Sequence, residues 1–387
     1  MTEHVSELVW EDVSFSYSRD GTNLVLDRLN FCAKKGRITV VTGPSGCGKS
    51  TMLYLAAGLY PQNAGVLTAG RVLAGGMEVT ALPAQQRARE IGMMFQNPDL
   101  QFCMDTVKNE LIFCLENVAA PPGEMDEAAA KALAFCGVSH LKERRLAALS
   151  GGEKQKTALA CVVALGPKWL VLDEPFANID ETSARDIARK LREMASGFGM
   201  GIVVADHQLE IWSEFADELA VLDGAAIAAR GLAPGKPPDE VWRKHGVGQP
   251  GRPYQDGPTQ KRGRPFPPIL QLTQLTVCQD KEPVIKNCCA DFARGRVHAI
   301  IGASGSGKST LFEAICGFRR YGGGIRINGR EMKRNRRNVS GARIGFVFQN
   351  PQDQFVAGSV LDEVLVSLRR RTPGRSAGAG ANVGGSA

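Results

Sequence analysis

The sequence predicts an α/β fold, in which helices cover a parallel sheet, and it predicts this fold twice, with the second copy incomplete. Three short apolar runs, at residues 37–43, 169–175 and 201–206, have the composition of buried β-strands. Helical patterns such as residues 181–195 lie between them, and strands that alternate with helices form parallel sheets. Two long motifs each occur twice, which indicates that the domain is duplicated.

The duplication is visible in two motifs that recur in the same order. GPSGCGKST at 43–51 recurs as GASGSGKST at 302–310, which is 259 residues later. FQNPDLQF at 95–102 recurs as FQNPQDQF at 348–355, which is 253 residues later. Chance does not supply two long matches in one order at nearly one spacing, so the halves are copies of one domain.

The predicted domain boundaries follow changes in composition. A first domain at 1–229 is followed by a linker at 230–268, which is rich in Pro, Gly and Arg and has no hydrophobic period. The second domain is predicted at 269–371 and contains only the N-terminal part of the copy. Gly, Ala and Ser dominate residues 372–387, which could bury no face, so we expect a disordered tail there.

Composition excludes several classes of protein. A hydrophobic content of 43% is enough to build a core for each domain. No apolar run approaches the length of a membrane-spanning helix and the N-terminus lacks the features of a signal peptide, so we expect a chain that is neither exported nor membrane-spanning. The ten cysteines include no CxxC pair, which argues against a zinc site and against a disulfide framework.

The net charge of +7 lies mostly in the linker, where residues 229–268 hold eight Lys or Arg and three acidic residues. A basic linker is usually a solvated spacer. A segment that binds anionic lipid head groups, or one that binds nucleic acid, would also be basic. The charge alone does not distinguish these two roles from that of a spacer.

The first copy of the repeated motif fits the pattern GxxxxGK[ST] directly after a strand, where glycine amides and a helix N-terminus surround a triphosphate. Lys49 would place a cation on the β- and γ-phosphates, and Ser50 would offer a hydroxyl to Mg²⁺. A chance glycine-rich turn is the alternative, and the preceding strand and the duplicate argue against it. The predicted ATP-binding residues of this loop are Gly43, Ser45, Gly46, Gly48, Lys49, Ser50 and Thr51.

Two carboxylates end the apolar strand of WLVLDEP. Asp173 is predicted to hold Mg²⁺, and Glu174 is predicted to orient the water that attacks the γ-phosphate. His207 follows the next apolar strand, which puts its imidazole at the same edge of the sheet as Glu174. These residues together predict a site that hydrolyses ATP.

LSGGEKQK at 149–156 is the most discriminating string in the chain. Two glycines after a serine line the positive end of a helix with amides, which suits an anion. The string resembles the signature of the ABC family. In that family the signature reaches across a head-to-tail dimer to the nucleotide of the other domain, which would make Ser150, Gly151 and Gly152 ATP-binding residues. A capped surface helix with Ser150 as its N-cap is the alternative.

The resemblance to ABC proteins covers nearly all of residues 5–225 and implies a P-loop NTPase fold with three parts. These are a parallel-sheet core, an antiparallel β subdomain and a helical signature subdomain. Gln96 resembles the Q-loop glutamine, which is implied as a catalytic residue and a Mg²⁺ ligand, and Asp180 resembles the D-loop acid. Tyr17 resembles the aromatic residue that stacks on adenine, with a strand core residue as the alternative.

The two FQNP strings, and DHQLE around His207, resemble the energy-coupling factor importers, which take up vitamins and transition-metal ions such as cobalt and nickel. This resemblance implies ATP and Mg²⁺ as cofactors and a peripheral location at the cytoplasmic face of the membrane. The implied partners are a transmembrane coupling subunit, a substrate-binding membrane subunit and a further ATPase subunit, with no nucleic acid. The alternatives are a soluble tandem ABC ATPase that acts on ribosomes or DNA, and a regulatory ABC protein that binds ATP without turnover.

The second copy lacks most of the chemistry of the first. Only 38 residues follow Gln349, whereas 111 separate Gln96 from His207, so no signature, catalytic glutamate or histidine fits after it. Glu363 in SVLDEVLV imitates a strand that ends in Asp-Glu, but it lies 253 residues after Glu110 and is predicted to be its counterpart, without a catalytic role. At the adenine position LTQLTVCQD has no aromatic residue. The predicted ATP-binding residues of this copy are Gly302, Gly305, Gly307, Lys308, Ser309, Thr310 and Gln349.

Overall fold

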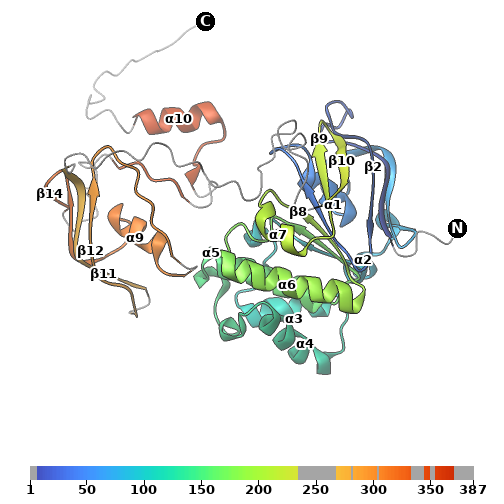
Figure 1. Ribbon diagram of the computed structural model, residues 1–387, viewed down its shortest axis with the longest axis horizontal. Coiled ribbons are helices and arrows are strands. Elements are labelled where there is room, and N and C mark those ends of the chain that lie inside the picture. Colours follow the sequence, from blue (N-terminus) through green and yellow to red (C-terminus); the bar gives the residue numbers. More distant parts are fainter. Residues whose placement is uncertain are drawn as a thin grey trace, which may run out of the picture. The chain divides into compact units, whose positions relative to one another are not determined.

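The structure is a computed structural model (Figure 1) that describes residues 7–233, 267–279, 282–302, 305–332, 344–348 and 354–369. The chain forms two compact units, one of residues 1–261 with 302–306 and the other of residues 262–301 with 307–387. Gln349, most of the predicted linker and the predicted tail lie outside the described residues.

A six-stranded sheet forms the centre of the first unit, in the order β10-β9-β3-β8-β7-β6. All neighbours pair in parallel except β9 and β10, which are antiparallel. The three apolar runs recognised in the sequence are β3, β7 and β8, which confirms the predicted α/β class with a parallel core. The strands are β3 (Ile38–Thr42), β6 (Ile91–Met94), β7 (Trp169–Asp173), β8 (Gly201–Ala205), β9 (Glu218–Asp223) and β10 (Ala226–Leu232).

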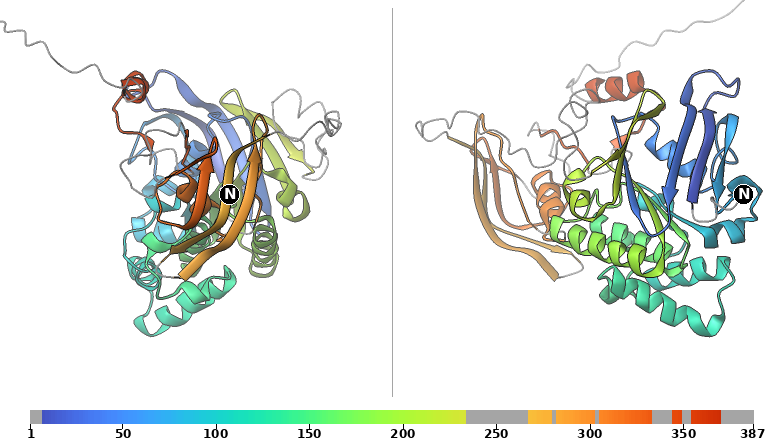
Figure 2. Two further views of the ribbon diagram at one scale, coloured as in Figure 1. Left: turned by 90° about the vertical axis from the view of Figure 1, so that its left-hand side faces the viewer. Right: turned by 45° about the vertical axis from the view of Figure 1, so that its right-hand side comes forward.

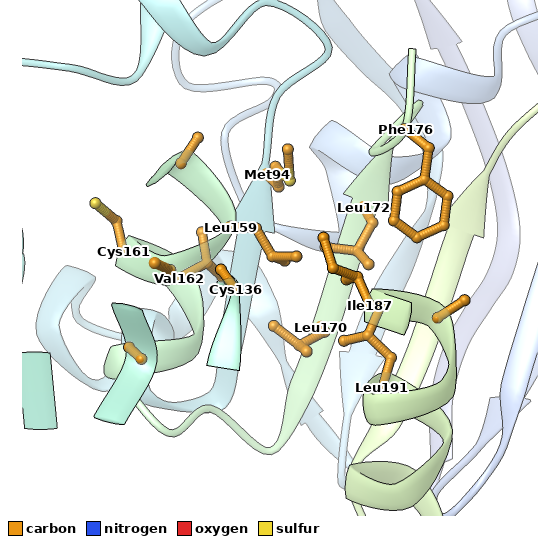
Figure 3. Packing of buried hydrophobic residues seen from close by; sticks show 14 of the residues in the cluster. Met94, Cys136, Leu159, Cys161, Val162, Leu170, Leu172, Phe176, Ile187 and Leu191 are labelled. Carbon is orange, nitrogen blue, oxygen red and sulfur yellow. The ribbon is translucent and has the colours of Figure 1, made fainter. Parts of the chain in front are cut away.

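The central strands β3, β7 and β8 are buried along their whole length and are mostly apolar, because both faces of the sheet are covered. Successive side chains of a strand point to opposite faces, so Leu170 and Leu172 of β7 belong to one core and Trp169 and Val171 to the other. The first core is filled by helices, as Figure 3 shows for Leu159 and Val162 of α5 and for Ile187 and Leu191 of α6. The second core is filled by α1 and by a separate antiparallel sheet.

Helices α3 to α6 gather on one side of the first unit, away from the antiparallel strands (Figure 1). The longest, α6, carries Ala184, Ile187, Ala188 and Leu191 at spacings of three and four, which makes one apolar face, and it ends at Gly199 with φ of 66°. Within the described ranges, no helix has the length and apolar character needed to cross a bilayer. The helices are α1 (Lys49–Ala56), α2 (Ala84–Glu90), α3 (Val107–Asn117), α4 (Pro122–Phe135), α5 (Gly151–Ala164), α6 (Glu181–Phe198) and α7 (Leu209–Phe215).

The same antiparallel sheet occurs in both units. In the first unit its order is β2-β1-β4-β5, and in the second it is β12-β11-β13-β14, so the strands correspond one to one. Figure 2 shows the second sheet, in orange, as a curved layer. The strands are β1 (Glu7–Ser16), β2 (Leu24–Lys34), β4 (Val66–Ala74) and β5 (Met77–Glu78) in the first unit, and β11 (Pro268–Gln279), β12 (Glu282–Ala293), β13 (Gly322–Ile327) and β14 (Arg330–Glu331) in the second.

A shared irregularity shows that the two sheets are copies in detail. Asp12 of β1 and Gln274 of β11 both have positive φ, 51° and 47°, where the pairing register shifts. A Cβ on Gly70 would lie 2.3 Å from a carbonyl oxygen beside Asp12, and a Cβ on Gly323 would lie 2.3 Å from that of Gln274. Only glycine allows the neighbouring strand to approach so closely, so the bulge and the glycine were duplicated together.

The second unit lacks a described counterpart of the parallel sheet. Residues 297–301 align with β3 but form no strand, and Val297 and Ile301 are 100% and 92% exposed. In the first unit β3 pairs with β8 on one side and β9 on the other. The described residues of the second unit include α9 (Lys308–Ile315) and α10 (Val360–Arg369) but no copies of those two strands.

The domain boundary predicted at residue 229 falls inside strand β10. Strand β10 continues to Leu232, because Arg230 donates from Nε to Glu218 at 3.1 Å and from a terminal nitrogen to the carbonyl of Cys32 at 2.9 Å. Its guanidinium also lies 5.3 Å from the centre of the Phe31 ring. Strand β11 begins at Pro268, one residue before the predicted start of the second domain. The sequence did not indicate that Arg230, the first residue of the predicted linker, belongs to the sheet.

Truncation of the core should destabilise the first unit strongly. Leu170 is fully buried under α5 and α6, so we expect Leu170→Ala to lower the free energy of unfolding by about 2–5 kcal/mol through lost burial and the cavity left behind. Denaturant unfolding followed by tryptophan fluorescence measures the change. Phe198→Ala is the control, since Phe198 is 84% exposed, and an equal loss in both variants would contradict this description of the core.

Candidate active site

The parallel sheet brings four chain segments to one edge. In the pairing register Asp173 of β7 lies opposite Ala205 of β8, and Val41 of β3 lies opposite the same residue from the other side. The segments that follow β3, β6, β7 and β8 therefore start at a common edge, the carboxyl ends of the strands. This is where open α/β sheets bind their ligands.

The loop between β3 and α1 approaches its neighbours too closely for any residue but glycine at two positions. A Cβ on Gly43 would lie 2.0 Å from the carbonyl oxygen of Leu222 on β9. Gly48, the N-cap of α1, has φ of 104°, and a Cβ there would lie 2.9 Å from Leu26. The loop thus packs closely against the sheet and continues directly into the N-terminus of α1, where free backbone amides favour the binding of an anion.

The ammonium group of Lys49 lies inside this loop. Lys49 is 9% exposed, and its Nζ donates to the carbonyl oxygens of Gly43 at 2.8 Å and Pro44 at 3.0 Å. A cation so placed, beside a helix N-terminus, supplies the charge that the oxygens of a di- or triphosphate require.

Asp173 is a buried carboxylate at the end of β7. Burial raises its pKa to about 6, although a hydrogen bond from the Ser50 hydroxyl and the charge of Lys49 oppose the rise. The neighbouring negative charge of Glu174 adds to the rise, and the hydroxyl of Tyr54 donates a further hydrogen bond. Its Oδ2 is buried and accepts no hydrogen bond from the described residues.

This donor set fits a magnesium ion. Mg²⁺ takes oxygen ligands from one or two carboxylates or hydroxyls and completes its shell with phosphate oxygens and water. A buried carboxylate oxygen without a hydrogen-bond donor, next to the hydroxyl of Ser50, offers such ligands. The arrangement of Asp173 and Ser50 is compatible with their predicted role as metal ligands, which stays a prediction.

The carboxylate of Glu174 is held between two side chains from different segments. Gln96, which follows β6, donates from Nε2 to Oε2 of Glu174 at 2.8 Å. His207, which follows β8, places Nδ1 3.3 Å from Oε1. Of the three residues predicted to act in catalysis, Glu174 thus contacts both of the others, and each of the three follows a different strand.

A residue that the sequence analysis did not single out fixes the position of His207. Asp206 is 2% exposed, and its Oδ1 accepts from the backbone N–H of His207 at 2.7 Å and of Gln208 at 2.9 Å. Its Oδ2 accepts from Trp212 Nε1 at 2.8 Å. Burial raises the pKa of Asp206, and these donors oppose the rise. In the sequence, Asp206 is recognisable only as an acid directly before His207. One sequence does not show whether such an acid has a structural role.

Tyr54 and Gln155 were also missed. Tyr54 lies one helical turn after Ser50 on α1, so both hydroxyls reach the same carboxylate of Asp173. Gln155 on α5 donates from Nε2 to the carbonyl oxygen of Glu174 at 3.2 Å. The helical spacing could have suggested Tyr54, whereas the contact of Gln155 joins segments 19 residues apart and has no signal in the sequence.

Tyr17, the residue predicted to stack on adenine, lies beside the start of α1. Its hydroxyl is 2.8 Å from Oγ1 of Thr51, and its ring makes edge contacts with Phe15 and Tyr60 at centroid distances of 5.2 and 5.8 Å. The residue is 49% exposed, so one part of the ring stays open. The strand β1 ends one residue earlier, at Ser16, so Tyr17 is not part of the strand core.

The signature residues are arranged around a helix start. Ser150 is the N-cap of α5 and forms a capping box with Glu153, in which each side chain bonds the backbone N–H of the other. Asp180 likewise caps α6 and accepts from Ser183 N–H at 3.0 Å. No hydrogen bond among the described residues joins Ser150, Gly151 or Gly152 to the phosphate loop of the same unit.

The second unit repeats the helix after its phosphate loop but little else. Gly307 caps α9 with φ of 89°, and Lys308, Ser309 and Thr310 form the first turn. Gly302 and Gly305 are described, and Gly305 has φ of 80° like Gly46. At the positions of Tyr54 and Tyr60 this unit has Glu313 and Arg319, which pair at 2.6 Å.

Glu363 has the same contacts as Glu110 and not those of a catalytic acid. Glu110 accepts from the backbone N–H groups of Cys103 at 2.9 Å and Met104 at 2.8 Å. Glu363 lies on helix α10 and accepts from Val356 and Ala357, both at 2.8 Å. These pairs correspond at the same shift of 253 residues, so both carboxylates hold the loop before a helix.

Comparison with known proteins gives one consistent family. The sequence model of the family described as ABC transporter matches residues 26–177 and 285–372. The putative HMP/thiamine import ATP-binding protein YkoD of Bacillus subtilis is 32% identical over 385 residues, which cover 92% of this chain and 70% of that protein. A putative ABC transporter ATP-binding protein of Methanosarcina mazei is 28% identical over 411 residues, with coverage of 93% and 69%. The chain spans about 70% of the length of these two relatives.

Solved structures agree with this family. CbiO1 of Clostridium perfringens, described as part of the ABC transporter complex CbiONQ, is 30% identical with a TM-score of 0.52 and covers 61% of this chain and 93% of its own. The dimeric ABC transporter cassette MJ0796 is 22% identical with a TM-score of 0.53, and covers 58% of this chain and 97% of its own. At this identity, the similarity to MJ0796 supports a shared fold only.

The ionised carboxylate of Asp173 should lower the free energy of unfolding at neutral pH. Because its folded pKa, about 6, lies above the ordinary value of 3.8, protonation favours the folded state. This contribution is complete below about pH 4 and is lost as the pH rises through 6. We expect Asp173→Asn, which mimics the protonated form, to stabilise the first unit at pH 7 without Mg²⁺ by on the order of 2–3 kcal/mol.

Thermal unfolding at pH 4.5, 6 and 7.5 measures this effect. The advantage of the Asn variant should shrink as the pH falls toward 4. A variant that is less stable than the parent at pH 7.5 would show that the carboxylate is not desolvated as described.

Proposed function

Because this chain belongs to the ABC transporter family, whose ATP-binding domains hydrolyse ATP, we propose that it is the ATP-binding and ATP-hydrolysing subunit of an importer of the energy-coupling factor type. The first unit is the catalytic one. The observation that carries this proposal is the contact of Glu174 with both Gln96 and His207 at the carboxyl edge of the sheet.

The residues of the first unit divide the work of hydrolysis. Lys49 and the amides at the start of α1 bind the β- and γ-phosphates. Glu174 accepts a hydrogen bond from the attacking water and orients it, while Gln96 and His207 keep the carboxylate in place. Mg²⁺, when bound by Asp173 and Ser50, would neutralise charge that develops on the phosphate oxygens. Tyr17 would stack on the adenine.

The signature of a second ABC domain would complete the site. In the head-to-tail arrangement of the family, Ser150, Gly151 and Gly152 contact the γ-phosphate bound by the other domain. Their position at the capped N-terminus of α5 supports this role, because the amides there are directed out of the helix. Asp180 of the D-loop lies at the start of α6 and is proposed to line the same interface.

A membrane partner is proposed to dock on the segment after Gln96. This segment exposes Leu100, which is 69% accessible, and Met104, which is 36% accessible. It is attached to α5 because Asp99 pairs with Lys154 at 2.6 Å and Gln101 donates to the carbonyl of Ala158 at 3.1 Å. A push on this segment would therefore reach the signature helix, and the glutamine that contacts Glu174 starts the same segment.

The class of transported compound is proposed from the relatives. YkoD is named for import of HMP and thiamine, and CbiO1 for the CbiONQ transporter complex. We propose a vitamin or a transition-metal ion as the cargo, a transmembrane coupling subunit and a substrate-binding membrane subunit as partners, and the cytoplasmic face of the membrane as the location. The names of these two proteins refer to import and to a transporter complex, which favours the importer over an ATPase that acts on ribosomes or DNA.

The two phosphate-loop lysines separate the roles of the two units. We expect Lys49→Ala to reduce ATPase activity at saturating Mg-ATP to background, because the loss of a charge-assisted hydrogen bond weakens binding by about 10- to 100-fold and removes transition-state stabilisation. Lys308→Ala should retain most of the activity, since the described residues of its unit include no acid corresponding to Glu174. The opposite ranking would place the working site in the second unit.

Leu100 offers a test of the membrane partner. We expect Leu100→Glu to lose co-purification with membrane subunits from detergent extracts while it keeps parental affinity for ATP, because a charge enters the apolar contact. Phe198→Glu is the matched control, an exposed apolar residue at the far end of α6. Recovery of ribosomal RNA or DNA in place of membrane subunits would favour the alternative of a tandem ABC ATPase on nucleic acid.

A further inference from the structure

The backbone of Glu174 adopts a conformation that most residues avoid. Its φ is 44°, which lies in the left-handed region that favours glycine. A residue with a side chain stays in this region only when its surroundings determine it, and such residues concentrate at functional sites. The direction in which the carboxylate leaves the backbone therefore depends on contacts to the backbone N–H and carbonyl groups of this one residue.

Both polar atoms of the Glu174 backbone are held. Its N–H donates to the carbonyl of Ala205 on β8 at 2.9 Å. Its carbonyl oxygen accepts from the N–H of Ala177 at 3.3 Å, within the following turn, and from Nε2 of Gln155 at 3.2 Å. Gln155 is thus a side chain from a distant helix that contacts the backbone of Glu174.

Gln155 is itself firmly placed. It is 0% exposed, and its Oε1 accepts from Nδ2 of Asn178 at 3.5 Å, so one amide group bridges the strand end and the turn that follows it. It lies on α5, four residues after Gly151, where the helix begins. A buried amide that uses both of its ends has a defined orientation and is costly to leave unpaired.

We infer that Gln155 is a positioning residue for ATP hydrolysis, which holds the left-handed peptide of Glu174 so that the carboxylate meets Gln96 and His207. The inference rests on the proposed function, in which Glu174 orients the attacking water. Gln155 acts through the backbone of Glu174 and touches neither nucleotide nor water. Without it the peptide relaxes toward ordinary φ values, and the carboxylate turns away from its two partners.

The contact also links two parts of the site. Gln155 is on the helix whose N-terminus carries Ser150, Gly151 and Gly152, so a rigid shift of α5 changes the hydrogen bond to Glu174. Lys154, the preceding residue, pairs with Asp99 in the segment after Gln96. The first two turns of α5 therefore contact the loop of Gln96 on one side and the peptide of Glu174 on the other.

A double-mutant cycle tests the inference on the full chain. We expect Gln155→Leu to lower kcat for ATP hydrolysis by about 10- to 100-fold, the loss typical of a misplaced catalytic group, with KM for ATP changed by less than about threefold. In a Glu174→Gln background the same change should lower the residual rate by less than about twofold, since a residue that acts only through the carboxylate has nothing left to position.

The matched control is Thr157→Val. Thr157 is on the same helix and is fully buried, and its Oγ1 has no hydrogen-bond partner among the described residues. Replacing this unpaired hydroxyl with a methyl group of similar shape breaks no hydrogen bond and should leave kcat within about twofold of the parent. Should Gln155→Leu fold poorly, as judged by its melting temperature, Gln155→Asn keeps a buried amide but is one methylene too short to reach Glu174, and the same fall in kcat is expected.

The outcomes separate the inference from the proposed function. Parental kcat in folded Gln155→Leu or Gln155→Asn, or losses that multiply fully in the double variant, would overturn the positioning role. Glu174→Gln with parental activity would instead overturn the proposed catalytic role of Glu174. A kcat loss in Gln155→Leu that disappears in the Glu174→Gln background would support both.

Discussion

The rest of the structure depends on the pairing of β3 between β8 and β9. This pairing joins the segment before the phosphate loop to strands that come more than 150 residues later in the chain, and it buries both faces of the sheet. Because parallel strands end at the same edge, the loops after β3, β6, β7 and β8 meet there. Lys49 and His207 follow β3 and β8, which this register joins, while Gln96 and Glu174 follow β6 and β7, which pair in parallel beyond β8.

The second unit shows what happens to the same segment when those partners are absent from the described residues. Its antiparallel sheet and the helix α9 are built like those of the first unit, with the bulge and its glycine included. These parts depend on contacts within about 60 residues of each other. Within the described ranges no strand pairs with the second unit's counterpart of β3, residues 297–301, and Val297 and Ile301 are exposed. Local elements thus form in both copies, whereas the site requires the long-range pairing of the first.

Three buried acids of the first unit show how hydrogen bonding distinguishes structural from functional carboxylates. Glu110 accepts from two backbone amides, and Asp206 accepts from two backbone amides and an indole. Each holds a loop in place. Asp173 has one oxygen without a donor and a pKa raised to about 6. A buried carboxylate left unsatisfied costs stability, and a cation bound at that oxygen would offset the cost.

The sequence by itself determined the α/β class, the duplication, the strands β3, β7 and β8, and the group of Lys49, Ser50, Asp173, Glu174 and His207, since each of these follows from a local pattern next to a strand or a helix start. It also matched Glu363 to Glu110 from spacing alone. Only the tertiary structure decided that Glu174 has a left-handed backbone, that Gln155 donates to its carbonyl oxygen, that Asp206 accepts from the backbone of His207, and that Arg230 belongs to β10. These features depend on which distant segments pack together, and a hydrogen bond between a helix and a strand end leaves no periodicity in the chain.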